Sequence, residues 1–352
     1  MDSVTQAVLG ASVSGVLLGR YHGRKAYVAG AVLATLPDLD VIIRYGNPIA
    51  DMIHHRGFSH SVFVLTAFSA FLTWALRYWP PARQYSWKRL FATLWLIFIT
   101  HVLADAFTSY GTQLFWPLKP TPTSWSSLFI IDPFFTLPLL FSAIAGFGWG
   151  NRIFVRKMDA WALGWCVLYL GLSLTAKYTV ENRIQNTLAR QGVNVSAVFS
   201  TPGPFSILLW RVVARTDDDH YYEYVTSLLD DKPREYVKAA LNSHLAQQFP
   251  EDAMISGQRW FAGDWVRYDV VDNHLVSTDL RMGLGTGYYS FRFKIAERND
   301  NNQWQVITPQ RWPADRGFDA LKTVLLRVMP SAPELPLHDW EKRMHLKPEP
   351  LQ

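Results

Sequence analysis

Apolar and polar positions divide the chain near residue 177. The first half contains six apolar segments, at residues 4–18, 26–43, 62–79, 90–107, 129–149 and 160–176. A helix that crosses a bilayer needs about 20 such residues, with a range of roughly 17–25. The last four segments meet this length. The first is short and the second is interrupted by Pro37, Asp38 and Asp40, a pattern compatible with a re-entrant hairpin. We therefore predict an all-α polytopic membrane domain over residues 1–177.

The second half, residues 178–352, carries most of the charged side chains, and we predict a soluble domain of mixed α/β structure. Residues 207–215, 221–227 and 289–298 are rich in β-forming side chains or alternate between apolar and polar positions, which predicts strands. Residues 233–249, which begin with a proline, and residues 315–329 are predicted to be helices. The sequence leaves open whether this domain is a lid, a substrate selector or a partner-binding module.

The basic residues of the first half alternate between loops. Three alternate loops together hold ten Lys and Arg residues, whereas the two loops between them hold three. Because loops rich in Lys and Arg remain on the cytoplasmic side, both chain ends are expected outside. The sequence thus predicts a multi-pass protein of the bacterial inner membrane, with the C-terminal domain on the periplasmic side and the lipid bilayer as its first partner.

Overall composition narrows the functional classes. The net charge of +5 comes without a Lys/Arg block or zinc-finger spacing, so nucleic acid is not an expected partner. Cys166 is the single cysteine, which excludes an intrachain disulfide and a zinc site built from cysteines. The polar start of the chain lacks the basic region of a cleavable signal peptide.

Ionisable side chains of the membrane domain fall on one face of the predicted topology. Each lies at the outer end of its apolar segment or in the adjoining outer loop. The residues concerned are Asp2, Asp38, Asp40, His54, His55, His60, His101, Asp105 and Asp132. A chance distribution would place about half of them on the other side. Such residues are costly at membrane depth and usually functional, so their common side indicates a site.

The residue types indicate a metal site. His101 and Asp105 are spaced i, i+4 and share one helix face, so they can bind one ion together. Asp38 and Asp40 follow Pro37 at a helix end, where two carboxylates can converge. Histidine and aspartate together suit zinc, with manganese as the second choice.

Eight residues are candidate metal ligands, and His54 is left out as a spacer. The candidates are Asp2, Asp38, Asp40, His55, His60, His101, Asp105 and Asp132. Eight exceeds the four ligands of one zinc ion, so either two ions bind or several of these residues support the ligands.

Simpler roles exist for each residue alone. Asp132, before Pro133, has the pattern of a helix N-cap, and Asp2 can cap the first helix or be solvated. Asp38 and Asp40 can end a span, and a single His-x-x-x-Asp pair is often structural. Arg56 has two interpretations: it binds a phosphate or a developing oxyanion, or it anchors the chain to lipid headgroups.

Several short motifs together resemble a known family. They are MDSVTQAVLG at residues 1–10, PDLD at 37–40, HRGFSHS at 55–61, HVLAD at 101–105, YGT at 110–112 and IDP at 131–133. Their order and spacing resemble the YdjM/YbcI-type family of inner-membrane proteins, which are regarded as metal-dependent hydrolases. The resemblance covers about residues 1–177.

The resemblance implies an integral inner-membrane protein with a metal-dependent hydrolase activity. It places the family's site on the same eight candidate residues. A more distant similarity to zinc-dependent phospholipases C and P1-type nucleases implies phosphoester substrates. This chain has Gln6 where many members of the family have a histidine. Because glutamine is a poor zinc ligand, a site that needs this histidine would lack one ligand here.

Two functions from different classes follow. The first is a hydrolase in which a metal-activated water attacks an ester or phosphoester of a lipid-like or envelope substrate. Asp40 or Asp105 would then be the general base, and Arg56 would stabilise the developing charge. The second is a metal-stapled membrane scaffold without turnover, whose outer domain recruits partners. Transport is less favoured, because the later spans offer no charged residue at mid-membrane.

Overall fold

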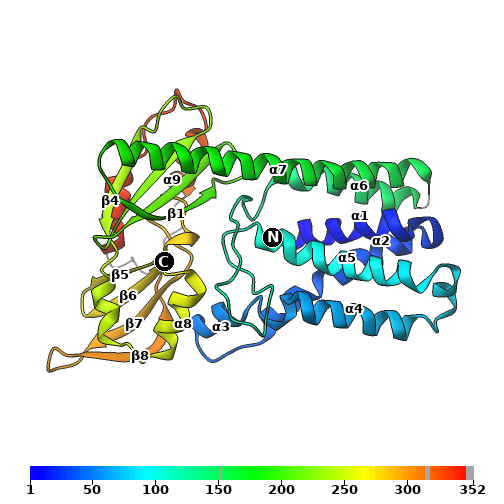
Figure 1. Ribbon diagram of the computed structural model, residues 1–352, viewed down its shortest axis with the longest axis horizontal. Coiled ribbons are helices and arrows are strands. Elements are labelled where there is room, and N and C mark those ends of the chain that lie inside the picture. The colour runs from blue at the N-terminus through cyan, green and yellow to red at the C-terminus, as the bar shows by residue number, and fades with distance from the viewer. Residues whose placement is uncertain (151, 314–317, 346–352) are drawn as a thin grey trace. The chain divides into compact units, whose positions relative to one another are not determined.

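The computed structural model describes residues 1–150, 152–313 and 318–345 (Figure 1). The chain forms two compact units. The first unit combines residues 1–43 with 54–173, and the second combines residues 44–53 with 174–352. The long helix α7 (Ile153–Arg190) contributes residues to both.

The first unit is helical. Its elements are α1 (Ser3–His22), α2 (Arg24–Thr35), η1 (Pro37–Ile42), η2 (Phe58–His60), α4 (Val62–Leu76), η3 (Pro80–Gln84), α5 (Trp87–Ala106), α6 (Pro133–Trp149) and the first part of α7. Polar N-caps begin several of them, because a side-chain oxygen can accept the free N–H groups of the first turn. These caps are Asp2 for α1, Ser61 for α4, Ser86 for α5 and Asp132 for α6.

Each of the six predicted apolar segments contains a helix of this unit. Two helices, α5 and α7, are long and apolar enough to cross a membrane. A third candidate is the pair formed by residues 48–60 and α4, which bends by 45° at the break. The second apolar segment is divided: α2 ends at Thr35, and the tighter η1 begins at Pro37. The structure therefore supports two or three spans, and six crossings remain a prediction.

Helix α1 packs against α2, α5 and α6. Small residues allow this close approach: a Cβ on Gly10 would lie 2.5 Å from the carbonyl oxygen of Gly30 on α2. Other helices present bare apolar side chains at the surface, with Val167 and Trp161 on α7 72% and 80% exposed. An apolar surface of this kind is stable in lipid rather than in water.

The second unit contains two four-stranded antiparallel sheets. The first has the order β1 (Val195–Pro202), β2 (Leu209–Thr216), β3 (His220–Ser227), β4 (Glu235–Ala240). The second has the order β5 (Val266–Val271), β6 (His274–Asp279), β7 (Arg292–Arg298), β8 (Trp304–Arg311). Short helical elements accompany the sheets: α3 (Pro48–His54), η4 (Ser243–Gln248), α8 (Ala253–Ala262), η5 (Leu280–Met282), α9 (Phe318–Leu326), α10 (Leu337–Lys342) and η6 (Arg343–His345).

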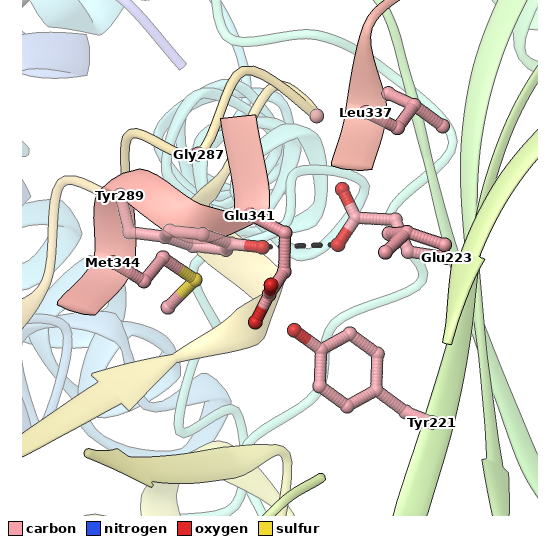
Figure 2. Close-up of a pocket in the computed structure, with 9 residues that line it drawn as sticks. Tyr221, Glu223, Gly287, Tyr289, Leu337, Glu341 and Met344 are labelled. Atoms are coloured by element: carbon pink, nitrogen blue, oxygen red, sulfur yellow. Dashed lines mark hydrogen bonds between the residues drawn. The ribbon is translucent and has the colours of Figure 1, made fainter. Parts of the chain in front are cut away.

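Charged side chains are buried between these sheets, around a small cavity (Figure 2). Glu223 on β3 accepts a hydrogen bond of 3.0 Å from the Tyr289 hydroxyl and pairs with Arg211 at 2.8 Å. Glu341 on α10 pairs with Arg267 on β5 at 2.7 Å. Buried charges are stable only when paired in this way, so the network fixes the positions of both sheets and α10.

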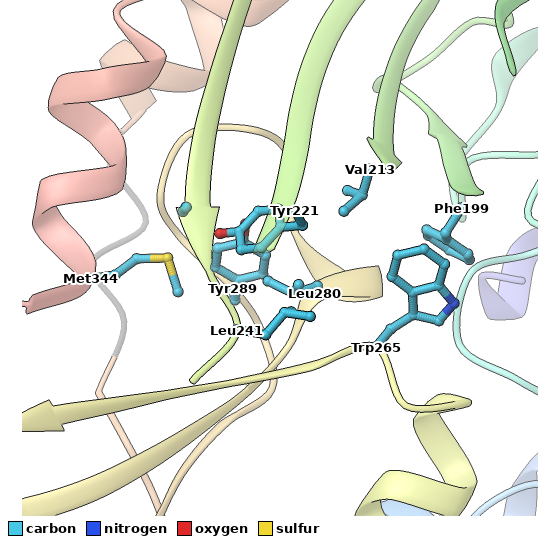
Figure 3. Close-up of a cluster of buried hydrophobic side chains, with 9 residues drawn as sticks. Phe199, Val213, Tyr221, Leu241, Trp265, Leu280, Tyr289 and Met344 are labelled. Atoms are coloured by element: carbon cyan, nitrogen blue, oxygen red, sulfur yellow. The ribbon is translucent and has the colours of Figure 1, made fainter. Parts of the chain in front are cut away.

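Apolar side chains from both sheets complete this core (Figure 3). Val213 and Tyr221 from the first sheet meet Leu280, which follows β6, and the buried side chains of Tyr289 and Met344. Because several of these residues are far apart in sequence, the core forms only when the two sheets and η6 pack together.

Three strand predictions are confirmed and one helix prediction is wrong. β2, β3 and β7 lie within or close to the predicted segments. Residues 233–249 instead form β4 and η4, because residues 235, 237 and 239 are buried while 236 and 238 are exposed. This alternation has the period of a strand. The predicted helix at 315–329 corresponds to α9, and its start lies outside the described residues.

Candidate metal centre

Four predicted ligands meet in the first unit. Asp38 comes from η1, His60 from η2, and His101 and Asp105 from the last turns of α5. Pro37 begins η1, and the i, i+4 spacing on α5 places His101 and Asp105 on one helix face. Both histidines and Asp105 are buried, whereas the side chain of Asp38 is 24% exposed. Asp38 is therefore the member of the group that solvent or a ligand can reach.

The distances within this group are close to those of four ligands arranged tetrahedrally around one ion. The Nε2 atoms of His60 and His101 lie 3.3 Å apart. Asp105 Oδ2 lies 3.2 and 3.4 Å from them, and Asp38 Oδ1 lies 3.3 and 3.6 Å from them. A tetrahedron with metal–ligand bonds of about 2.0–2.1 Å has edges of about 3.3–3.4 Å. These five distances are close to the edges of such a tetrahedron, and all four ligand atoms lie within 4.8 Å of one another, so the group could hold one zinc-sized ion.

One atom of the group shows why a cation fits there. Asp38 Oδ1 is buried and makes no hydrogen bond within the described residues. A buried carboxylate oxygen without a partner is costly. A divalent cation between Asp38 Oδ1, Asp105 Oδ2 and the two facing imidazole nitrogens would satisfy all four atoms.

Asp40 holds the loop around this group. Its carboxylate accepts hydrogen bonds from the backbone N–H of Arg56 at 3.0 Å and from the Ser59 hydroxyl at 2.5 Å, and its Oδ1 lies 2.7 Å from His55 Nδ1. These three contacts occupy both oxygens of the carboxylate, so Asp40 already has three partners.

The hydrogen bonds of Ser59 determine which nitrogen of His60 carries a proton. Ser59 Oγ lies within hydrogen-bond distance of both Asp40 Oδ2 and His60 Nδ1, the latter at 2.9 Å. A hydroxyl donates one proton, and an ionised carboxylate can only accept. Ser59 therefore donates to Asp40, and His60 Nδ1–H donates to Ser59. The lone pair of His60 Nε2 then faces the other ligands, as metal coordination requires.

Arg56 lies inside the site. Its side chain is 6% exposed, donates to Thr108 Oγ1 at 3.2 Å, and pairs with Asp105 Oδ1 at 3.1 Å. The guanidinium also lies 5.0 Å from the centre of the Tyr110 ring. The backbone φ of Arg56 is +61°, a left-handed conformation that costs a non-glycine residue about 1–2 kcal/mol. The burial of the Arg56 side chain does not match its second interpretation, that of a lipid-headgroup anchor.

The other carboxylate oxygen of Asp105, Oδ1, contacts residues at the N-terminus of the chain. Asp105 Oδ1 accepts a hydrogen bond of 3.1 Å from Gln6 Nε2 and contacts the amino group of Met1. Gln6 also donates to the carbonyl of His101 at 3.2 Å. Gln6 thus forms hydrogen bonds with two of the four candidate ligands, His101 and Asp105.

Besides Asp40, three further candidates lie outside the four-residue group. Asp2 accepts hydrogen bonds from the N–H groups at the start of α1, and Asp132 does the same for α6 and also accepts one from the Tyr169 hydroxyl at 3.0 Å. His55 contacts Asp40 and packs its ring against Tyr110. Metal ligation by Asp2, Asp132, His55 and Asp40 therefore stays a prediction.

The sequence predictions did not include the hydrogen-bonded contacts of Ser59 or Thr108 with the site. Ser59 lies next to His60 in the sequence, and this adjacency was the one available signal. A serine beside a histidine is too common to assign a role without the distance to Asp40.

Helices that are long and apolar enough to cross a membrane, together with a buried group of two histidines and two aspartates that could hold a metal ion, indicate a membrane protein with a candidate metal site. Sequence comparison identifies its family. The chain belongs to the YdjM inner membrane protein family, whose profile matches residues 1–180. This confirms the resemblance found in the motifs and the assignment to an inner-membrane family.

The chain is also similar to a Bacillus subtilis (strain 168) protein described as "Uncharacterized protein YfhP". The two are 31% identical over 143 residues, which cover 38% of this chain and 42% of the relative. The match thus spans less than half of the relative's length. No solved structure matches the chain.

Proposed function

We propose that the protein is a membrane-bound, metal-dependent hydrolase that acts on an ester or phosphoester of a lipid-like or envelope substrate. The observation that carries this proposal is the near-tetrahedral group of Asp38, His60, His101 and Asp105. These four residues would hold a divalent cation, zinc or manganese, as one ion or as the first of two. Such a cation supplies Lewis acidity and makes water nucleophilic near neutral pH.

The surrounding side chains have separate proposed roles. Arg56 Nε is buried and has no hydrogen-bond partner within the described residues, so this N–H is available to an anionic oxygen of a substrate. Asp105 is assigned as a ligand whose second oxygen Arg56 holds in place. Asp40 is assigned as a positioning residue, because its oxygens already accept the hydrogen bonds that fix His55, Arg56 and Ser59.

The surface near the centre favours an amphiphilic substrate. Leu39, between the two aspartates of η1, is 52% exposed, and Ile42 is 72% exposed. Phe58, two residues before His60, is 45% exposed. Exposed apolar side chains beside the partly exposed Asp38 suit a molecule that brings a lipid chain and a polar ester together. We place this surface at the periplasmic side of a bundle with six crossings, on the charge pattern of the loops.

A metal analysis tests the first step. Full-length protein in detergent should contain one or two equivalents of a transition metal. The combined His60→Ala, His101→Ala, Asp105→Ala variant should lose the metal. The control variant His22→Ala, which changes a histidine on α1 outside the group, should retain it. Absence of metal from the wild-type protein, even after reconstitution with zinc and manganese, would remove the basis of the proposal.

A lipid assay tests the second step. Metal-loaded protein in vesicles should release products from phosphoester or ester lipids, and this activity should disappear in the triple variant while His22→Ala keeps it. Loss of metal without loss of the detected activity would show that the hydrolysis occurs elsewhere.

A metal-stapled scaffold is the second candidate, and one observation favours it. Asp38, His60, His101 and Asp105 alone can complete a tetrahedron, and a zinc site with four protein ligands is typically structural. This hypothesis expects bound metal without turnover, a stoichiometric crosslinked partner, and no loss of a lipid or glycan species on deletion. In a hydrolase, water or substrate would approach the group at the partly exposed Asp38.

A further inference from the structure

A polar cleft lies within the second unit, separate from the metal centre. Its volume is about 530 Å³, within the range of about 300–1,000 Å³ typical of ligand sites. The turn between β2 and β3, the segment η4, the end of α8 and the strand β5 line it. The cleft is therefore large enough to hold a ligand of several rings.

The charged side chains of the cleft already have partners. Arg259 pairs with Asp264 at 2.8 Å, and Arg215 donates to the Asp264 carbonyl at 2.9 Å. Asp219 accepts the Ser243 N–H at 2.9 Å, and Asp217 accepts a hydrogen bond of 2.7 Å from Asn194. The lining holds three aspartates and two arginines, so it repels rather than attracts an anion.

A metal ion is not favoured here either. Among the described residues, the group with metal-ligand spacing is the one in the first unit. The aspartates of the cleft are exposed or engaged in turns, which explains their conformations without a cation.

Two side chains on η4 differ from these. His244 and Gln247 are exposed on η4, and their side chains make no hydrogen bond within the described part of the chain. The hydroxyl of Tyr268 is buried and likewise has no partner among the described residues. Leu241 and Val266 add an apolar strip to the lining. The unpaired groups of the lining are thus an exposed imidazole, an exposed carboxamide and a buried phenol, beside two buried apolar side chains.

We propose that this cleft binds a neutral, hydroxyl-rich ligand, that is, a saccharide. A sugar ring presents hydroxyl groups at its edge and C–H groups on its face, which matches the free neutral hydrogen-bonding groups beside an apolar strip. Satisfaction of the buried Tyr268 hydroxyl, directly or through a water, adds a further gain on binding. The proposal does not depend on the metal centre.

Isothermal titration calorimetry on the full chain tests this site. The protein is kept in lauryldimethylamine oxide, a detergent without a sugar headgroup, and titrated with triacetylchitotriose, maltotriose and inorganic phosphate. We expect saturable binding of at least one trisaccharide and none of phosphate. The double variant His244→Ala, Gln247→Ala should weaken this binding about thirtyfold, since two lost hydrogen bonds contribute about 1 kcal/mol each.

Gln248→Ala is the matched control, because Gln248 is exposed on the same η4 segment and does not line the cleft. It should bind the trisaccharide as the wild-type protein does. The proposal is overturned if neither trisaccharide binds, if the double variant binds as tightly as the wild type, or if Gln248→Ala weakens binding equally. Binding of phosphate alone would also overturn it, in favour of an anion site.

Discussion

Replacement of Ser59 by alanine should weaken metal binding although Ser59 is not a ligand. The Ser59 hydroxyl bridges His60 Nδ1, at 2.9 Å, and Asp40. Without it, the nearest Asp40 oxygen lies 3.7 Å from His60 Nδ1, too far for a hydrogen bond. His60 can then also place its proton on Nε2, where it blocks coordination. Loss of such a support typically lowers metal affinity by about 10–100-fold.

Competition between the protein and a chromophoric zinc chelator measures this affinity directly. Ser59→Thr retains a hydroxyl and should remain close to the wild-type affinity. Ser69→Ala is the control for loss of a buried serine, because Ser69 donates only to the Leu65 carbonyl on α4. If Ser59→Ala binds zinc within twofold of the wild-type affinity, with unchanged stoichiometry, the assignment of the His60 tautomer is wrong.

Two further predictions concern stability. Gly146→Ala should lower the melting temperature, because the new Cβ would lie 2.1 Å from the Tyr27 ring, at a cost of about 1–3 kcal/mol. The control Gly148→Ala should leave the melting temperature unchanged, because its Cβ meets no atom within 4 Å. Hydrogen bonding with His345 helps to lower the pKa of Glu341 from 4.5 to about 2, so the ionised carboxylate stabilises the fold above pH 4.5. Glu341→Gln should therefore lower the melting temperature at pH 7, and this difference should shrink toward pH 2. Equal melting temperatures of the two glycine variants would contradict the first prediction. An effect of Glu341→Gln that does not change with pH would contradict the second.

Local patterns in the sequence were sufficient to find the helical region and a set of eight candidate ligands that includes the four central residues. Long apolar runs indicate helices in lipid whatever their neighbours, because each such helix satisfies its own backbone hydrogen bonds. His101 and Asp105 could be paired from their spacing alone, since helix geometry places positions i and i+4 together. Asp38 and His60 were predicted from their common side of the membrane and from the motifs.

Other features depend on contacts between distant segments. Residues 233–249 have a composition suitable for a helix, and the pairing of β4 with β3 determines that they begin as a strand. The ion pair between Arg267 on β5 and Glu341 on α10 likewise joins residues far apart in the sequence.

The sequence by itself thus determined which residue types gather at one end of the apolar helices. Only the tertiary structure decided how each carboxylate is used. Asp38 and Asp105 face two imidazoles, Asp40 holds Ser59 and the Arg56 backbone, and Asp2 and Asp132 cap helices. The physical reason is the short range of hydrogen bonds and metal–ligand bonds, which depend on positions to within a few tenths of an ångström. The spacing of residues along a chain does not specify distances of that kind between separate elements.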